Sequence, residues 1–460
     1  MSRTFNVINP ATGARVGAAP DASADDARAA IERSVAAFPL WKAKTAFERG
    51  DLLRRWRDRI LQNEDALARL MTAEMGKPIT ESRGEVKYAA GFVDWYAEEG
   101  KRAYGDLIPT HAAGKRLLAT RQPVGPVYAV TPWNFPSAMV TRKVAPALAA
   151  GCSVVLKPAE QSPLTAIRLA ELWVEAGGPA EVFQVVTTSD PVAVSEPFFA
   201  DARVRKLTFT GSTEVGKLLY AQAARTVKRV SLELGGHAPF LIFEDADIAH
   251  AVTQVMATKF RNAGQTCVCA NRIYVHASIR EAVVVQLAEA VRALRVGDPL
   301  DEATQIGPLV DRAGLDKVTA HVADAIAKGA RAVVGGQAGQ GLYFEPTLLV
   351  DVAAGMRILE EETFGPVAPI VSFTSEAEVI AAANDTPYGL AAYLWTRDLG
   401  RAFRVSEALD YGIVGVNDGL PATPHAPFGG VKASGVGREG GRWGLDEYLD
   451  VKYVSIALPA

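Results

Sequence analysis

The sequence predicts an α/β protein with two doubly wound domains and a small additional β element. From about residue 125, short apolar runs alternate with amphipathic helical stretches, and the alternation resumes after Cys267. Strands and helices that alternate in this way form βαβ units, which build a parallel sheet covered by helices. The chain has 460 residues. At roughly 150 residues per domain, this length accommodates two or three domains.

The composition is that of an ordinary globular protein. Hydrophobic residues make up 49% and charged residues 22% of the chain, and the net charge is -3, which argues against nucleic acid as the main partner. The first residues lack the apolar core of a secretory signal, and no apolar run approaches the length of a membrane span. Three cysteines allow at most one disulfide. We therefore expect a cytoplasmic protein with reduced thiols and no membrane partner.

Residues 21–104 are expected to be mainly helical. Ser23 and Asp26 have the spacing of an N-terminal capping box, and Ile31 and Val35 begin an apolar face at helical spacing. Further amphipathic stretches follow, with arginines on their polar faces. This segment should therefore supply helices rather than strands.

Short apolar runs beyond this segment are expected to be strands. The runs before Cys267 are VYAVTP, SVVLKP, VFQVV, KLTFTG and FLIFED. The runs after it are RIYVH, RAVVGG, PIVSF, YLWT and GIVGVN. The second series indicates a second α/β domain.

The C-terminal stretch EYLDVKYVSIAL alternates between apolar and polar residues, as a strand does. It is a natural partner for the stretch at 117–123. A terminal strand can pair within its own chain or across two subunits, and the spacing does not choose between the two.

Two of the three cysteines lie in RNAGQTCVCANR, residues 261–272. Structural zinc sites usually use two C-x2-C pairs, whereas one residue separates these cysteines and the six histidines are scattered, so no metal site is expected. Cys152, in an apolar run, is interpreted as a buried inert thiol. Cys267 follows small and polar residues that would leave a thiol accessible. From this stretch alone, a nucleophile and a buried thiol both remain open.

Two further motifs follow predicted strands. Glu233, in VSLELGGHAPF, is either a general base or a strand-end acid that binds backbone amides. KLTFTGSTEVGKLL resembles a phosphate loop, but Leu218 stands where such a loop needs a hydroxyl, which disfavours a nucleoside triphosphatase. The turn at Gly211 and Ser212 is either a phosphate site made of backbone amides or a plain turn.

Two proline-bounded stretches, TPWNFP and KPAEQSP, also close predicted strands. Parallel sheets bind ligands at the carboxyl ends of their strands. Asn134 is therefore a candidate donor to a developing oxyanion, and Lys157 and Glu160 are candidates for binding ribose hydroxyls. Each motif alone is explained at least as well by packing and turn formation.

Taken together, these stretches resemble the aldehyde dehydrogenase superfamily over nearly the whole chain. TPWNFP, KPAEQSP, FTGSTEVGK, LELGG, GQTC, EETFGPV and PFGGVKASGVGREGG occur in the family's order. EGKRAYGDLIP, VTRKVAPALAAGC, NAGQTCVCANR and GLDEYLDVKY are most similar to the succinate-semialdehyde dehydrogenase branch. The resemblance implies an aldehyde dehydrogenase-like homodimer or homotetramer with three parts. These are a Rossmann-like NAD-binding domain (1–110 and 130–234), a catalytic domain (235–428) and a small β oligomerisation element (111–129 and 429–460).

The resemblance also implies roles for residues already named. Cys267 would be the nucleophile that forms a thiohemiacetal and then a thioester. Asn134 and the backbone N–H of Cys267 would bind the oxyanion, and Glu233 would activate the hydrolytic water. Because the Glu160 carboxylate suits free ribose hydroxyls and repels a 2′-phosphate, NAD is expected to be preferred over NADP. The cofactor is expected against Thr131, Pro132, Trp133, Lys157, Glu160, Gly211, Ser212, Leu234, Glu362 and Phe364.

Arg142 and Arg261 match the arginines that hold a distal carboxylate in this branch, and an Arg binds a carboxylate bidentately. Ala422 stands where the branch has a serine. Succinate semialdehyde is therefore the first candidate substrate. A longer or bulkier aldehyde, such as glutarate semialdehyde or an aromatic aldehyde, is the second. A thiol esterase is a remote alternative, as is an inactive binding or structural protein with the same fold. Cys269 is a candidate partner for Cys267 in a redox disulfide.

Overall fold

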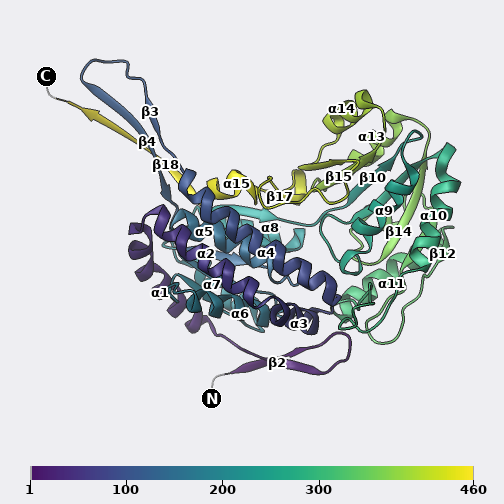
Figure 1. Ribbon diagram of the computed structural model, residues 1–460, viewed down its shortest axis with the longest axis horizontal. Coiled ribbons are helices and arrows are strands. Elements are labelled where there is room, and N and C mark those ends of the chain that lie inside the picture. The colour runs from purple at the N-terminus through teal and green to yellow at the C-terminus, as the bar shows by residue number, and fades with distance from the viewer. Residues whose placement is uncertain (1–2, 459–460) are drawn as a thin grey trace.

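The computed structural model describes residues 3–458, which form two α/β bodies and a narrow β arm (Figure 1). Figure 1 shows the labelled helices of residues 24–224 in the body on the left and those of residues 248–408 in the body on the right. The arm projects from the left body. Each body is built on its own sheet and the arm on a third, which confirms the predicted fold class. Within residues 3–458, no helix combines the length and the apolar character needed to cross a membrane.

Four long helices dominate the first hundred residues and confirm the helical prediction for that segment. Ser23 and Thr45 each begin a helix with a capping box, in which side chain and backbone bond reciprocally with an acid three residues later. The N-terminal hairpin of β1 (Thr4–Ile8) and β2 (Arg15–Pro20) was not predicted. The helices are α1 (Ala24–Ala43), α2 (Ala46–Gln62), α3 (Glu64–Met75), α4 (Ile79–Glu99) and the short η1 (Gly100–Arg102).

The first sheet has the order β17-β9-β8-β5-β6-β7. Its neighbours are parallel except for β17, which is antiparallel to β9. The strands are β5 (Val127–Val130), β6 (Val154–Lys157), β7 (Phe183–Val185), β8 (Lys206–Thr210), β9 (Arg229–Glu233) and β17 (Gly435–Val436). The helices between them are α5 (Ala138–Ala150), α6 (Pro163–Glu175), α7 (Pro191–Ala200) and α8 (Thr213–Ala224).

The second sheet has the order β12-β13-β14-β11-β10-β15-β16. The run RAVVGG forms β12, an antiparallel edge strand beside β13, a strand that was not predicted. The strands are β10 (Ala238–Ile242), β11 (Ala270–His276), β12 (Arg331–Val334), β13 (Thr347–Val350), β14 (Val367–Phe373), β15 (Ala391–Trp395) and β16 (Ile413–Val416). The helices are α9 (Ile248–Lys259), η2 (Arg261–Gly264), η3 (Ala277–Ile279), α10 (Arg280–Arg292), α11 (Arg312–Ala327), α12 (Arg357–Glu360), α13 (Glu376–Asn384) and α14 (Leu399–Ala408).

The arm is a three-stranded antiparallel sheet of order β18-β4-β3. Its strands are β3 (Asp106–Ile108), β4 (Lys115–Pro123) and β18 (Leu449–Ala457). Pairing of β18 with β4 runs from Leu449 opposite Pro123 to Ala457 opposite Lys115, so the predicted pairing of the tail occurs within one chain. The last short elements, η4 (Lys432–Ser434) and α15 (Gly441–Asp446), precede β18.

The strand pairings refine the predicted division of the chain, which itself stays a prediction. β3 belongs to the arm although it precedes residue 111. β5 and β17 both lie in the first sheet, although the prediction placed β17 and most of β5 in the β element.

The two sheets present opposite ends to the space between the bodies. Turns after β5, β8 and β9, at the carboxyl ends of the first sheet, contribute to the same cavity as the segment that leads into β14. Cys267, which precedes β11, lies on that cavity too. Functional side chains can therefore come from the turns that follow strands of the first sheet and from the segments that precede strands of the second sheet.

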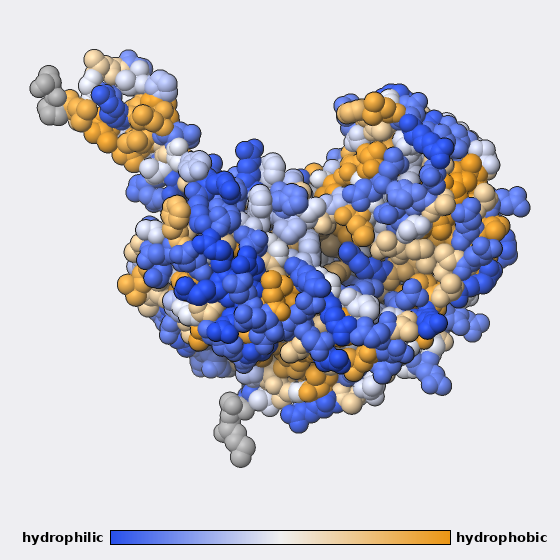
Figure 2. All heavy atoms as spheres, in the orientation of Figure 1, coloured by the Kyte–Doolittle hydropathy of each residue, from blue (hydrophilic) through white to orange (hydrophobic). Residues whose placement is uncertain are grey.

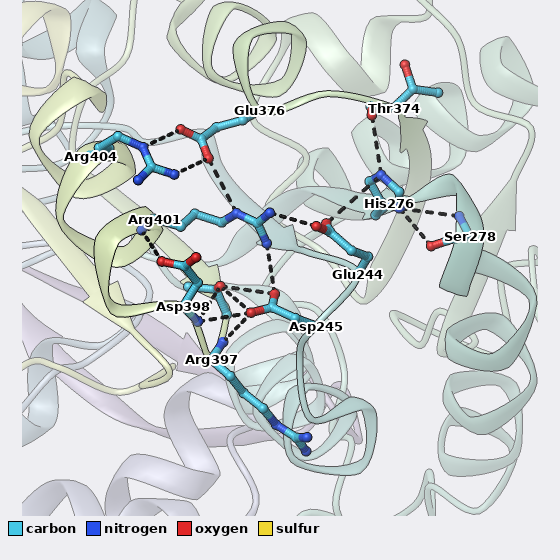
Figure 3. Close-up of polar contacts among 11 residues, drawn as sticks. Glu244, Asp245, His276, Ser278, Thr374, Glu376, Arg397, Asp398, Arg401 and Arg404 are labelled. Carbon is cyan, nitrogen blue, oxygen red and sulfur yellow. Dashed lines mark hydrogen bonds and ion pairs between the residues drawn. The ribbon is translucent and has the colours of Figure 1, made fainter.

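The carboxyl ends of the second sheet hold an ion-pair network instead (Figure 3). Arg401 of α14 donates to Glu244 at 2.6 Å, Asp245 at 2.9 Å and Glu376 at 3.3 Å. The hydrogen bond from Arg404, together with that from Arg401, outweighs burial and lowers the pKa of Glu376 below its usual value of 4.5. This network joins the loop after β10 to α13 and α14.

We predict that Arg401→Gln lowers the melting temperature at pH 7. It removes charge-assisted bonds to three partly exposed carboxylates, which together contribute about 1–3 kcal/mol. Because the folded pKa of these carboxyls is depressed, the stabilisation is present at neutral pH and is lost as pH falls through that pKa. The difference between wild type and variant in calorimetry should therefore shrink below about pH 4.

Arg397→Gln is the matched control. Its side chain is 71% exposed and approaches Asp247 only at 3.6 Å, so its melting temperature should stay close to that of wild type. An equal loss in both variants would contradict a special role for Arg401.

Candidate active site

Cys267 lies in the wall between two cavities. One, of about 400 Å³, is lined by Arg142, Arg261 and apolar side chains. The other, of about 430 Å³, is lined by turns of the first sheet and by α11. Cys267 borders both. A molecule bound in either cavity would therefore meet the same sulfur atom.

A left-handed turn places this cysteine. Asn262 and Ala263 have φ of 51° and 53°, and Gly264 has φ of 75°. Such values are costly for residues with a Cβ. Gly264 also has no room for one, because a Cβ would lie 2.1 Å from the carbonyl oxygen of Gly365. The backbone of α9 is thus redirected abruptly before the chain enters β11.

Side-chain amides brace this turn. Asn134 Nδ2 donates to the carbonyl of Gln265 at 3.0 Å, and Asn262 Nδ2 donates to the carbonyl of Asn134 at 3.1 Å. Gln265 Oε1 accepts from the backbone N–H of Val310 at 3.0 Å. Asn134 lines the larger cavity beside Cys267, and one of its two Nδ2 hydrogens remains available to a ligand.

Electrostatics keep the Cys267 thiol protonated in the resting protein. Burial raises the pKa of the thiol to about 12, although the nearby Arg142 guanidinium acts in the opposite direction. A thiolate is the stronger nucleophile. The sulfur therefore needs a proton acceptor when it attacks.

Glu233 is a buried carboxyl at the end of β9. Neither of its oxygens has a hydrogen-bond partner among residues 3–458. Burial and the neighbouring Glu439 raise its pKa well above the usual value. Glu233 lines neither cavity, and a Cβ on Gly429 would lie 2.8 Å from its Oε1. The carboxyl therefore binds a proton more readily than an exposed glutamate does, but its side chain must turn to reach a ligand.

Arg142 and Arg261 both border the smaller cavity. Arg142 Nε lies 2.9 Å from Glu439 Oε2, and its guanidinium stacks 4.0 Å from the centre of the Phe428 ring. In the described part of the chain, Arg142 Nη2 and Arg261 Nε have no hydrogen-bond partner. Two cations with free donors favour an anionic group, and two acids, Glu81 and Glu85, line the same cavity. Ala422 lies in the wall of this cavity.

Seven of the ten residues expected to bind the cofactor line the larger cavity, and three do not. Thr131, Lys157 and Glu160 lie outside it, with Lys157 Nζ 2.5 Å from Glu160 Oε1. Burial raises the pKa of Glu362 to about 7. The residues on the cavity are Pro132, Trp133, Gly211, Ser212, Leu234, Glu362 and Phe364.

The structure adds site residues that the sequence patterns did not single out. The larger cavity is also lined by residues at the N-terminus of α11, namely Asp311, Gly314 and Lys317. The smaller cavity is also lined by Tyr88 of α4 and by Phe428. They lie on ordinary helical or loop stretches, so only the three-dimensional packing brings them to the site.

The three cysteines are all free. Cys152 and Cys269 are buried, and the Cys269 sulfur accepts a hydrogen bond from Lys259 Nζ at 3.3 Å. No group of three or more His, Cys, Asp or Glu side chains in residues 3–458 is arranged to hold a metal ion.

Comparison with known proteins shows the family of this chain over nearly its whole length. The Aldehyde dehydrogenase family profile matches residues 1–454. An NADP(+)-linked succinate-semialdehyde dehydrogenase of Escherichia coli strain K12 is 55% identical over 456 residues, covering 99% of this chain and 94% of that protein. A glutarate-semialdehyde dehydrogenase of Pseudomonas putida is 52% identical over 456 residues, covering 99% and 95%. The crystal structure of succinate-semialdehyde dehydrogenase from Burkholderia pseudomallei is 50% identical with a TM-score of 0.98, covering 99% of this chain and 95% of that one.

We predict that alkylation of Cys267 by iodoacetamide accelerates about tenfold per pH unit between about pH 7 and pH 9, with no plateau, because the thiol pKa lies above this range. Mass spectrometry of the modified peptides measures the rate at each cysteine. Buried Cys152 is the internal control and should stay unmodified while the protein is folded. A plateau near neutral pH would contradict the protonated resting state.

Proposed function

Because the chain belongs to the aldehyde dehydrogenase family, we propose that it oxidises an aldehyde with a distal carboxylate to the corresponding diacid, with NAD(P) as the hydride acceptor. One observation carries the proposal. Cys267 lies between a cavity that holds two arginines and a cavity lined by the strand-end turns of a doubly wound sheet. Such turns are the usual place of a dinucleotide.

The larger cavity suits a dinucleotide chemically. A Cβ on Gly211 would lie 2.4 Å from the Phe209 ring, so the turn before α8 requires glycine, and the helix N-terminus favours a phosphate. Trp133 and Phe364 meet edge to face at 5.6 Å and would hold the nicotinamide end together with Glu362. When bound, the nicotinamide supplies a hydride acceptor.

Cys267 would add to the aldehyde carbon and form a thiohemiacetal. Its thiol proton has to leave as the carbon–sulfur bond forms, and we assign the ionised form of Glu233 as the acceptor, because its raised pKa makes it a stronger base than an exposed carboxylate. The developing oxyanion would be held by the free Nδ2 hydrogen of Asn134 and the backbone N–H of Cys267. Loss of hydride from the same carbon leaves a thioester on Cys267.

Glu233 would act a second time in hydrolysis of the thioester, once it has released the thiol proton to solvent and is ionised again. A water molecule that gives its proton to the carboxylate attacks the thioester carbonyl, and the Cys267 thiolate is the leaving group. Since Glu233 lines neither cavity, its side chain has to turn toward the sulfur for both steps. The neighbouring Gly429 leaves backbone rather than side chain beside it.

The substrate we propose is an ω-oxo acid, with succinate semialdehyde first and glutarate semialdehyde second. Arg142 and Arg261 would hold the distal carboxylate, and Cys267 the aldehyde end. Ala422 supplies no hydroxyl to this cavity, so acid binding rests on the two arginines. A cavity of about 400 Å³ is also compatible with a longer or aromatic aldehyde.

We propose that NAD is preferred over NADP. The half-buried Glu160 carboxylate would accept hydrogen bonds from ribose hydroxyls and repel a 2′-phosphate. The Lys157 ammonium at 2.5 Å offsets part of this repulsion. We therefore expect a preference rather than exclusion of NADP.

We propose that the arm pairs two copies of the chain in a homodimer or homotetramer. Hydrophobic side chains gather on the arm in Figure 2, and Leu107, Val451 and Tyr453 are 73%, 67% and 59% exposed. An exposed apolar strand face of this kind favours a protein partner. Three further predictions stay predictions: a Cys267–Cys269 disulfide under oxidation, a cytoplasmic location and, as a remote alternative, thiol esterase activity without a cofactor.

The proposal predicts a ranking of kcat/KM across aldehydes of increasing length, with and without a terminal carboxylate, tested with both cofactors. Acidic aldehydes of four or five carbons with NAD should rank first. Arg261→Gln should raise KM for the acids by about 10–100-fold, because it removes a charge-assisted contact worth roughly 1.5–3 kcal/mol. Neutral aldehydes should change much less. Equal losses for acidic and neutral aldehydes would contradict the substrate assignment.

Glu233→Gln should retain the first chemical step in part and nearly lose the second. In a rapid-mixing experiment, reduced cofactor should appear as a burst approaching one equivalent per active site, followed by a rate at least about 100-fold below wild type. Cys267→Ala, which cannot form the thioester, is the control and should give no burst. A variant without burst whose steady state equals wild type would refute the role in deacylation.

A further inference from the structure

We infer that Glu81 sets the selectivity of the smaller cavity for acids, by placing an ionisable carboxylate beside Arg261 and by holding the turn that carries Cys267. The inference rests on the proposed function, since it concerns how the carboxylate end of the substrate is recognised. Glu81 belongs to the first turn of α4 and lines the same cavity as Arg261 and Cys267. It is therefore a positioning and specificity residue rather than a catalytic one.

The link to the turn is a single hydrogen bond. Glu81 Oε2 accepts the backbone N–H of Asn262 at 2.8 Å. Asn262 is the first of the three left-handed residues that precede Cys267, and its amide is buried where the helix α9 no longer provides an acceptor. Loss of this acceptor would leave a buried donor unpaired in a strained turn.

Glu81 affects the substrate through the charge of its carboxylate. Arg261 immediately precedes Asn262 and has no hydrogen-bond partner for its Nε among residues 3–458. Glu81 and a substrate carboxylate would both be attracted by this guanidinium, and they would repel each other within one cavity. The ionised form of Glu81 therefore weakens binding of acids, whereas the protonated form does not.

The surroundings of Glu81 place this change near neutral pH. Burial raises the pKa of Glu81 to about 7, opposed by Lys77 and Arg261 and by the Asn262 amide, and reinforced by Glu85. Lys77 is already paired with Glu85 and lies 3.8 Å from the centre of the Phe135 ring. The remaining charges facing Glu81 are therefore largely matched, and Arg261 is the cation left for the substrate.

Glu85, one turn further along α4, does a different task. Its Oε1 accepts the backbone N–H groups of Ser137 and Ala138 at 2.9 and 3.1 Å, where α5 begins. Its other oxygen pairs with Lys77. Of the two acids on this cavity, Glu85 is thus held by three donors, whereas Glu81 accepts one backbone amide and faces Arg261.

The test uses protection of Cys267 from iodoacetamide by succinamate, which carries one carboxylate and one neutral amide. In wild type, the concentration that halves the alkylation rate should rise about tenfold between about pH 6 and pH 8 as Glu81 ionises. Glu81→Gln keeps an oxygen for the Asn262 amide but removes the charge. Its protection should stay tight at pH 8 and change by less than about twofold over the range.

Two controls separate charge from structure. Asp94→Asn removes one negative charge from the exposed side of α4, where Asp94 pairs with Arg57, and should keep the wild-type pH dependence. Glu81→Ala removes the acceptor as well as the charge, so the alkylation rate without succinamate should differ from that of Glu81→Gln by at least about threefold.

The outcomes separate this inference from the proposed function. If succinamate protects wild type and Glu81→Gln equally at every pH, the role of Glu81 is wrong while acid binding stands. If succinamate protects wild type no better than neutral succinamide, the acid-binding assignment fails, and the inference fails with it. Tight and pH-independent protection confined to Glu81→Gln supports the inference.

Discussion

The left-handed turn at Asn262, Ala263 and Gly264 is the constraint on which the site depends. It ends the direction of α9 and delivers Cys267 to the wall between two cavities. A backbone this strained persists only when its surroundings over-determine it. Here the amides of Asn134 and the Asn262 side chain, together with packing against the Gly365 carbonyl, supply that support.

The first sheet presents the carboxyl ends of its strands to the site, and the second sheet presents the amino ends of its strands. The first sheet offers the carboxyl ends of its strands, where turns and a helix N-terminus favour phosphates. The second sheet offers the entrance to β11, and its own carboxyl ends are closed by the ion pairs around Arg401. In the proposed function, this arrangement lets one sulfur atom serve a nucleotide on one side and an acidic aldehyde on the other.

Motifs predicted the chemistry better than the geometry. Cys267 and Asn134 lie together on the larger cavity as expected, because short loops fix them close to strand ends. Glu233 ends a strand as expected, but it lines neither cavity, and its carboxyl lies beside Gly429 and near the charge of Glu439, residues about 200 positions further along. Lys157 is paired with a neighbouring acid outside the cavity, and no local pattern reveals whether such a pair opens on ligand binding.

The fold was predictable where local signals were strong. The capping box at Ser23 and the apolar periodicity predicted the N-terminal helices, and short apolar runs predicted the parallel strands. β12 was predicted from RAVVGG, but β13 and its antiparallel pairing with β12 were not, because the four-residue stretch TLLV between Pro346 and Asp351 carries little directional information. Glu81 was not predicted as a site residue, because its role depends on a hydrogen bond to Asn262, 181 residues further along the chain.

In the proposed function, Cys267 separates the two ligands. A crystal structure of Cys267→Ala with both dinucleotide and an ω-oxo acid bound tests this separation. We expect the nicotinamide in the cavity of Trp133 and Phe364, and the acid in the cavity of Arg142 and Arg261, with its aldehyde carbon next to position 267. Both ligands on one side of residue 267, or the acid bound away from the two arginines, would contradict it.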